Sequence, residues 1–371
     1  MKQPSNSEYL VIWSFSHLVI SRILLVRLRE IGDVVFTTPA VRALRKHYSD
    51  AHISYIVEPH AAPVVRDNPH INDVIVAPRV RGVRGLAADL RLGRTLRAKR
   101  FDLAIDFHGG PRAALLTWLS GARERVGYEV IGRSWMYTRR VQRPRTLRAR
   151  HSVENQCDLL AAIGIAAPDR IAYPVEMPVD QQAAAEVDAR LARAGVGGDE
   201  RLVVIHVSAG NPFRRWPLAH FIALASTIAR EPRTRVVLTS GPSEQDAAAR
   251  VVDGARAMLG DTLAQRIVSC GEFSLAQLRA LVERAALYIG GDSGPLHIAA
   301  TSRVPIVGLY GPTLPARSAP WRDPSIRVAA VEPEPLPCRP CDQRVCAPGD
   351  FRCLTSIGAE QVVTAAIKCL T

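Results

Sequence analysis

Short apolar runs alternate with longer amphipathic segments along most of the chain. Runs such as 23–28 and 202–207 have the length of buried strands and are rich in Val, Ile and Leu. Segments such as 34–48 repeat apolar residues with helical spacing. This alternation predicts parallel sheets built from βαβ units. The predicted strands are 23–28, 52–57, 74–77, 103–107, 202–207, 236–239, 267–269, 285–289 and 305–310, and the predicted helices include 34–48, 180–194, 217–229, 275–285 and 359–369.

The clearest single βαβ unit covers residues 285–313. A strand at 285–289 leads into the loop Gly290–Pro295, and a helix of small residues and a second strand follow. The loop lacks bulk where a backbone must approach a ligand, and a helix start favours an anion such as phosphate. The alternative is an ordinary turn in which Asp292 or Ser293 caps the helix.

A similar unit lies near the start of the chain. The strand 23–28 is followed by a loop that contains Gly32 and Asp33, and a helical segment comes next. Asp33 could cap that helix. It could instead be a functional carboxylate, because open α/β sheets bind their ligands at the carboxyl ends of strands.

Three motifs, taken in order, resemble bacterial heptosyltransferases, glycosyltransferase family 9. The first is 24–44, with Gly-Asp followed by Pro39; the second is Arg214-Arg215-Trp216-Pro217; the third is 291–300, continuing to Gly311-Pro312-Thr313. The resemblance runs from about Arg22 to Leu370. The late cysteine pattern is most similar to the heptosyltransferase II branch.

The resemblance implies an α/β fold of GT-B architecture, with two Rossmann-like doubly wound domains that face each other across a cleft. We expect residues 1–20 to be a disordered extension and 21–175 to bind the acceptor. Residues 176–355 would bind the nucleotide sugar, and the helix in 356–371 would pack back on the first domain.

The activity implied is transfer of L-glycero-D-manno-heptose from ADP-heptose to the lipopolysaccharide inner core, with inversion. Asp33 would be the base, and Arg214 or Arg215 would stabilise the departing ADP. No cofactor would be required. Two other hypotheses stay open: the same fold with another nucleotide-sugar donor, and a non-catalytic protein that binds a nucleotide or glycolipid. The missing G-x-G-x-x-G after the first strand disfavours a dinucleotide dehydrogenase.

Further site residues follow from the same resemblance. Glu244 could accept hydrogen bonds from a ribose, Phe273 could cover the adenine, and Asp292 could hold heptose hydroxyls. Each residue also has a purely structural interpretation: Glu244 as a solvated carboxylate, Phe273 as core packing and Asp292 as a helix cap. The predicted donor-binding residues are Ser208, Glu244, Phe273, Asp292, Ser293, Gly294, Pro295 and His297, and the predicted acceptor-binding residues are Gly32, His108 and Arg112.

The charge of the chain favours acidic partners. The formal net charge is +13, which suits ADP-heptose, a phosphorylated lipopolysaccharide core and the cytoplasmic surface of the inner membrane. Nucleic acid is disfavoured, because the basic residues are dispersed and no zinc-finger, RRM or KH pattern accompanies them. The basic stretch 79–100 is either a solvated helix face or a surface for the acceptor or acidic lipid. The stretch 139–150 is predicted to be a mobile acceptor-side loop.

No membrane span is expected, because the apolar stretch 10–20 is too short to cross a bilayer. We therefore expect a cytoplasmic protein that associates peripherally with the inner membrane.

Seven cysteines occur, and four of them form the pattern C-x2-C-x4-C-x6-C. Close thiolates of this kind can hold a structural zinc ion. A disulfide or reduced thiols in a Pro-rich loop are the alternatives. We expect no catalytic metal. The four cysteines are Cys338, Cys341, Cys346 and Cys353.

Overall fold

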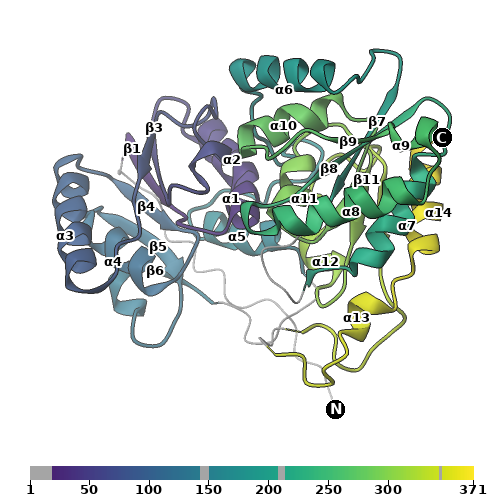
Figure 1. The fold of residues 1–371 in the computed structure, drawn as a ribbon. Helices are drawn as coiled ribbons and strands as arrows, with labels where there is room; N and C mark the ends of the chain where they lie inside the picture. Colours follow the sequence, from purple (N-terminus) through teal and green to yellow (C-terminus); the bar gives the residue numbers. More distant parts are fainter. Residues whose placement is uncertain (1–18, 143–149, 208–213, 342–344) are drawn as a thin grey trace.

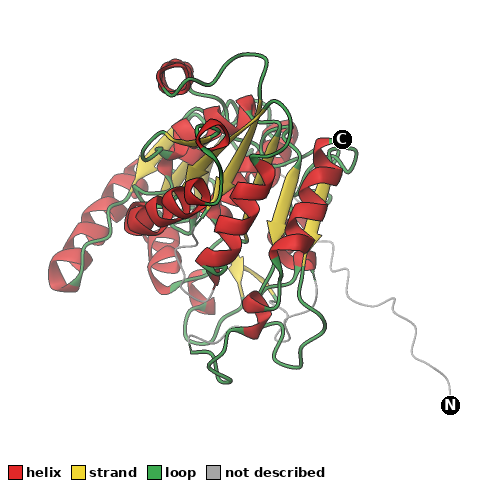
Figure 2. Cartoon of the chain, turned by 45° about the vertical axis from the view of Figure 1, so that its right-hand side comes forward, coloured by secondary structure: helices red, strands yellow, loops and turns green. Residues whose placement is uncertain are grey.

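A computed structural model describes residues 19–142, 150–207, 214–341 and 345–371. It contains two six-stranded sheets, each flanked by helices (Figures 1 and 2). The expected extension 1–20 lies outside the described residues except for its last two positions.

The first sheet has the strand order β3-β2-β1-β4-β5-β6, and every pair is parallel. This is the order of a dinucleotide-binding fold, with its switch point between β1 and β4. The elements are β1 (Arg22–Val26), α1 (Ile31–Val35), α2 (Thr38–His47), β2 (His52–Val57), η1 (Ala62–Val64), β3 (Asp73–Val76), α3 (Gly82–Ala98), β4 (Leu103–Asp106), α4 (Pro111–Leu119), β5 (Glu124–Tyr128), η2 (Ser134–Met136), β6 (Arg139–Val141) and α5 (Ser152–Ala161).

The second sheet repeats the same topology as β12-β11-β10-β7-β8-β9, again parallel throughout. Its switch point lies between β7 and β10. The elements are α6 (Gln181–Arg193), β7 (Arg201–His206), α7 (Leu218–Ile228), β8 (Thr234–Thr239), η4 (Pro242–Glu244), α8 (Gln245–Ala257), α9 (Asp261–Ala264), β9 (Ile267–Ser269), α10 (Leu275–Arg284), β10 (Leu287–Gly291), α11 (Gly294–Ala299), β11 (Ile306–Leu309), α12 (Pro315–Ser318), β12 (Val328–Val331), α13 (Arg352–Thr355) and α14 (Ala359–Leu370). The predicted α/β fold with two doubly wound domains is confirmed.

Strand β1 shows why the central strands read as continuous apolar runs. Ile23 and Leu25 join the core on one face of the first sheet, whereas Leu24 and Val26 join the core on the other. All four side chains are fully buried. A parallel strand covered by helices on both faces therefore needs apolar residues at every position.

Three strands, β5, β6 and β12, were not predicted from the sequence. The strand β5 contains Glu, Arg and Gly, and the strand β12 is a run of only four apolar residues, Val-Ala-Ala-Val, between Arg327 and Glu332. The stretch 139–150 was expected to be a loop, but Arg139–Val141 forms the edge strand β6. Residues 143–149 of that stretch lie outside the described residues.

The C-terminal helix does not pack back on the first domain as we expected. Helix α14 lies against α7 and against β10, β11 and β12 of the second sheet. Its residues Val362, Ala366 and Cys369 are buried in the core that also contains Phe221 and Leu309. Its apolar face is thus satisfied by the second domain.

The two domains share one apolar core. Residues of α1, α2 and α5 cluster with residues of α10, α11 and β10. Helix α1 packs directly on α11. Polar contacts add to this joint: His151, the N-cap of α5, accepts from the N–H of Val153 at 3.2 Å through Nδ1, and its Nε2 donates to the carbonyl of Ala319 at 2.8 Å.

Those two partners make the His151 joint sensitive to pH. Nδ1 must be an acceptor and Nε2 a donor, so the ring fits only as neutral imidazole. Burial lowers the pKa of His151 to about 4. An unfolded chain binds a proton at His151 that the folded chain does not, so stability falls as pH decreases from 6.5 towards 4.

We predict that the titration of His151 lowers the free energy of unfolding by about 2 kcal/mol as the pH falls from 7 to about 5. The control is His151→Asn, which keeps a good N-cap residue but does not titrate. Buried His206, with its own lowered pKa, is present in both proteins. Urea unfolding across this pH range should give a flatter profile for the variant. Identical slopes would show that His151 does not couple stability to pH.

Candidate active site

A cavity of about 580 Å³ lies at the carboxyl ends of the central strands, and both domains line it. The first domain contributes the loop after β1 and the start of α1. The second domain contributes residues after β7, β8 and β10 and the start of α10. The lining residues are Glu30, Ile31, Gly32, His206, Arg214, Ser240, Gly241, Pro242, Ser243, Glu244, Phe273, Leu275, Leu278, Asp292, Ser293, Gly294 and Pro295. Open α/β sheets bind ligands at this edge.

The starts of α1 and α11 touch each other beside this cavity. A Cβ added at Gly32 would come within 2.2 Å of Cδ2 of His297, and one added at Gly294 would come within 3.0 Å of Cβ of Ile31. The His297 ring also packs on Phe36, with 4.4 Å between ring centroids. Glycine at these two positions therefore allows the two domains to meet this closely. Gly32, predicted to bind the acceptor, also serves this contact.

Asp33 occupies the third position of α1 and is not its cap. Glu30 is the N-cap residue, and no side chain caps this helix. The Asp33 carboxylate is ion-paired with the Arg27 guanidinium, which also donates to the carbonyl of Phe107 at 2.6 Å. The Asp33 side chain is 40% exposed. A fixed, partly accessible carboxylate thus follows directly after three residues that line the cavity.

Asp292 is a buried carboxylate in the cavity wall. The Thr313 hydroxyl donates to its Oδ2 at 2.6 Å, Nη1 of Arg214 lies 3.5 Å from Oδ2, and Nε2 of His297 lies 3.4 Å from Oδ1. Burial alone would raise the pKa of Asp292, but His297, Arg214 and Thr313 lower it to about 2. Asp292 is therefore ionised at neutral pH. It does not cap α11, because Ser293 is the N-cap residue and makes no side-chain cap bond.

The structure separates the two arginines that the sequence could not distinguish. Arg214 lines the cavity and donates to the carbonyl of Asp292 at 3.1 Å. Arg215 is ion-paired with Glu244, whose Oε1 lies 2.7 Å from Nη2. The Glu244 side chain is only 4% exposed. The alternative interpretation of Glu244 as a solvated carboxylate is therefore wrong.

The remaining predicted donor residues divide into three groups. Phe273, Ser293, Gly294 and Pro295 line the cavity. His297 is buried behind it. Ser208 lies outside the described residues. Sequence analysis missed His206, which ends β7; its Nδ1 lies 2.9 Å from the Thr239 hydroxyl. Burial lowers the pKa of His206 to about 4, so His206 is neutral at physiological pH.

A second cavity of about 230 Å³ lies in the first domain and contains the other predicted acceptor residues, His108 and Arg112. The Arg112 guanidinium donates to Asp89 and Glu58 at 2.9–3.0 Å and to the carbonyls of Ala77 and Pro78. Arg112 thus ties together several segments of the cavity wall.

The loop that carries His108 is held by Asp106, which sequence analysis missed. Its Oδ1 accepts from the N–H groups of His108 and Gly109, and its Oδ2 accepts from the Tyr137 hydroxyl at 2.6 Å. Burial raises the pKa of Asp106 in spite of these bonds. The sequence Asp-Phe-His-Gly at the end of strand β4 is the signal that could have identified Asp106.

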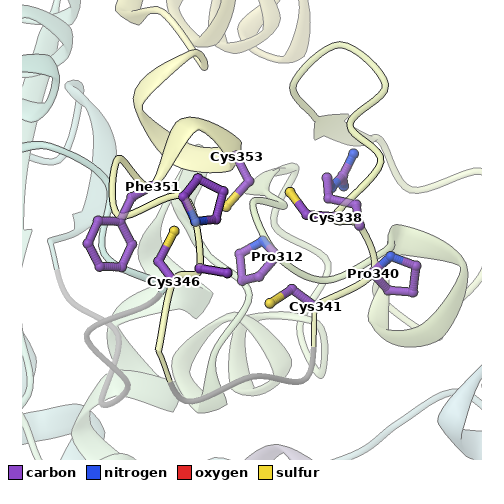
Figure 3. A pocket seen from close by; sticks show the side chains of 10 residues that line it. Pro312, Cys338, Pro340, Cys341, Cys346, Phe351 and Cys353 are labelled. Carbon is purple, nitrogen blue, oxygen red and sulfur yellow. The ribbon is translucent and has the colours of Figure 1, made fainter.

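The four clustered cysteines line a third cavity, of about 180 Å³, beside Pro312 (Figure 3). Burial, and next the nearby Cys338, Cys346 and Cys341, raise the pKa of Cys353. Among the described residues, no group of three or more His, Cys, Asp or Glu side chains is arranged to hold a metal ion. The structure therefore does not support the predicted zinc. All four have free thiols.

Two Rossmann-like domains that meet at a cavity lined by both form the GT-B architecture. The chain belongs to glycosyltransferase family 9 (heptosyltransferase), whose sequence profile matches residues 89–348. It is therefore a heptosyltransferase enzyme of lipopolysaccharide biosynthesis, as the motifs predicted.

Three known proteins illustrate the relationship. Lipopolysaccharide heptosyltransferase 3 of Escherichia coli is 29% identical over 84% of this chain and 89% of its own length. The family 9 glycosyltransferase of Veillonella parvula has a similar structure, with a TM-score of 0.82, 24% identity and coverage of 95% and 98% of the two chains. The E. coli ADP-heptose heptosyltransferase II has a TM-score of 0.75, 20% identity and coverage of 94% and 98%. Because the chain is similar both to a heptosyltransferase 3 and to a heptosyltransferase II, its expected place in the heptosyltransferase II branch stays a prediction.

Within the described residues, no helix has the length and apolar character that crossing a bilayer requires.

We predict that Gly32→Ala lowers the transfer rate by about 100-fold, because its Cβ would push α1 and Asp33 away from α11. Gly198→Ala is a suitable control, since no atom lies within 4 Å of a Cβ at that position. Adding His297→Ala to Gly32→Ala removes the clashing ring and should restore part of the rate. A Gly32→Ala enzyme with normal turnover would show that this contact does not position the site.

Proposed function

We propose that this enzyme transfers L-glycero-D-manno-heptose from ADP-heptose to a phosphorylated sugar of the lipopolysaccharide inner core, with inversion at the anomeric carbon. The observation that carries the proposal is the position of Asp33: its carboxylate follows directly after residues 30–32, which line the cavity between the domains. The cavity supplies the donor site, and Asp33 supplies the base at its rim. The similarity to the structure of E. coli ADP-heptose heptosyltransferase II supports the choice of donor.

The reaction requires two charge changes. The acceptor hydroxyl gives its proton to Asp33 as its oxygen bonds to the anomeric carbon. The bond from that carbon to the phosphate oxygen breaks on the opposite face, and ADP departs with the electron pair. Positioned proton transfer and stabilisation of the departing anion both lower the barrier.

We assign the ion pair with Arg27 a positioning role. The guanidinium holds one side of the Asp33 carboxylate and is itself held by the carbonyl of Phe107. The other side of the carboxylate is left to accept from the acceptor hydroxyl. The loop 107–110, whose Phe107 carbonyl accepts from Arg27, would approach the acceptor sugar through His108.

At the donor end, we assign the diphosphate to Arg214 and to the start of α11. Arg214 lines the cavity with Ser293 and Gly294, and its side chain is 37% exposed. Arg215 would act indirectly, by holding Glu244 near the ribose. Phe273 lines the same cavity and would cover the adenine, while Asp292 would accept hydrogen bonds from heptose hydroxyls. This cationic environment supports transfer that needs no cofactor.

We predict that Asp33→Asn reduces turnover by about 10²–10⁴-fold, because the amide cannot take up the proton. Affinity for ADP, measured by calorimetry, should stay close to that of the wild type. Glu30→Gln is the matched control, since it makes the same chemical change in a carboxylate of the cavity wall. If Asp33→Asn turns over normally while Glu30→Gln does not, the base is assigned to the wrong residue.

We predict unequal effects for the two arginines. Arg214→Ala should weaken ADP binding and lower the transfer rate by roughly 10–100-fold, the value of a hydrogen bond to a charged group. Arg215→Ala should affect binding less, because its partner is Glu244. Calorimetry with ADP and initial rates check both. Two mild single variants and a mild double variant would refute a phosphate role for this pair.

The acceptor proposed here is carried by a lipid. We therefore infer that the enzyme works at the cytoplasmic face of the inner membrane, without spanning it. The high positive charge of the chain supports this location, because phosphorylated core sugars and anionic lipids are both found there.

A further inference from the structure

One face of helix α3 is apolar and stays exposed among the residues that the structure describes. Val83, Leu86 and Leu90 are 86%, 53% and 40% exposed. Their spacing of three and four residues puts them on the same side of the helix. The neighbouring side of the helix, with Gly85, Gly93 and Leu96, is buried against the first domain. Exposed apolar side chains that gather in this way mark an interaction site.

The same helix is strongly basic. The stretch 79–100 has seven arginines and one lysine against a single carboxylate, Asp89. Asp89 points away from this face and is paired with Arg112. Arg84, Arg91 and Arg94 are exposed, and within the described part of the chain none of their side chains makes a hydrogen bond or ion pair. The apolar stripe is therefore flanked by uncompensated positive charge.

The location of α3 fits an enzyme whose acceptor is carried by a lipid. Arg79, which precedes α3 by three residues, lines the second cavity with His108 and Arg112. Figure 1 shows α3 at the end of the first domain that lies farthest from α6 and α8. The adjoining α4 has the exposed Trp118, whose ring lies 5.5 Å from that of the exposed Trp135.

We propose that α3 is the docking surface of this enzyme for an anionic phospholipid bilayer. Val83, Leu86 and Leu90 would enter the boundary between headgroups and acyl chains, and Arg84, Arg91 and Arg94 would bind lipid phosphates. The proposal rests on the lipid-carried acceptor proposed above. Docking in this orientation brings the cavity of His108 to the membrane surface, where the acceptor sugar projects. A second protein would meet an apolar stripe that has arginines but no accessible carboxylate, which favours a uniformly anionic partner.

The test is flotation of the full chain with two kinds of vesicle, phosphatidylcholine alone and phosphatidylcholine containing phosphatidylglycerol. We expect binding to the anionic vesicles only. Arg91→Glu/Arg94→Glu should reduce binding by at least about 25-fold, or roughly fivefold for each arginine lost. Val83→Ser/Leu86→Ser/Leu90→Ser should reduce binding even at low salt, because it removes the inserted side chains.

A matched control keeps the net charge equal. Arg193→Glu/Arg250→Glu makes the same change in charge on exposed positions of α6 and α8 in the second domain. This pair should bind vesicles nearly as the wild type does. Equal losses from the two pairs, or equal binding to neutral and anionic vesicles, would overturn the docking role of α3. A dimer in solution that the serine variant dissociates would assign the face to a second copy and also overturn the proposal.

A second measurement separates this proposal from the proposed reaction. With a delipidated, water-soluble core oligosaccharide, the α3 variants should keep the kcat/KM of the wild type. With the same acceptor embedded in anionic vesicles, they should lose rate in proportion to their lost binding. Lost rate on the soluble acceptor would mean that α3 serves the active site instead of the membrane. If the wild type transfers heptose to neither acceptor, the proposed reaction fails, whereas the flotation result still tests the docking surface.

Discussion

The contact between the starts of α1 and α11 fixes the geometry of this enzyme. Each helix follows a central strand, β1 in one domain and β10 in the other, so each start lies at a topological switch point. Gly32 leaves room for the His297 ring, and Gly294 leaves room for Ile31. Because packed interiors resist deformation, the position of Asp33 relative to the start of α11 is set by this one close approach.

Buried carboxylates then organise the charges around that contact. Asp292, Glu244 and Asp106 are all buried, and burial is costly for a charge unless it is paired or hydrogen-bonded. Arg214 lies beside Asp292, while Glu244 pairs with Arg215. The adjacent residues Arg214 and Arg215 therefore contact different carboxylates. Arg214 thus lines the cavity, whereas Arg215 is held by Glu244.

The sequence predicted the features that depend on local chemistry. The strands His52–Val57 and Ile267–Ser269 have the predicted limits, because each is an uninterrupted β-rich run. Features that depend on distant partners were not predictable. The sequence left Asp33 open between a helix cap and a functional carboxylate, whereas in the structure Glu30 stands at the cap position and Asp33 pairs with Arg27. The domain against which α14 packs depends on which domain has an exposed apolar face, and the amphipathic spacing of the helix does not indicate this.

The two domains put similar topology to different uses. In the second domain, loops after β7, β8 and β10 line the large cavity, and Arg214 and Asp292 contact each other in its wall. In the first domain, Arg112 links Glu58 and Asp89 into the wall of a smaller cavity. Within the described ranges, Arg84, Arg91 and Arg94 on α3 are exposed and their side chains make no hydrogen bond or ion pair. The outer side of the domain that carries Asp33 therefore has uncompensated positive charge. A rigid donor site joined to a basic outer surface suits an enzyme whose small donor is soluble and whose acceptor belongs to an anionic surface.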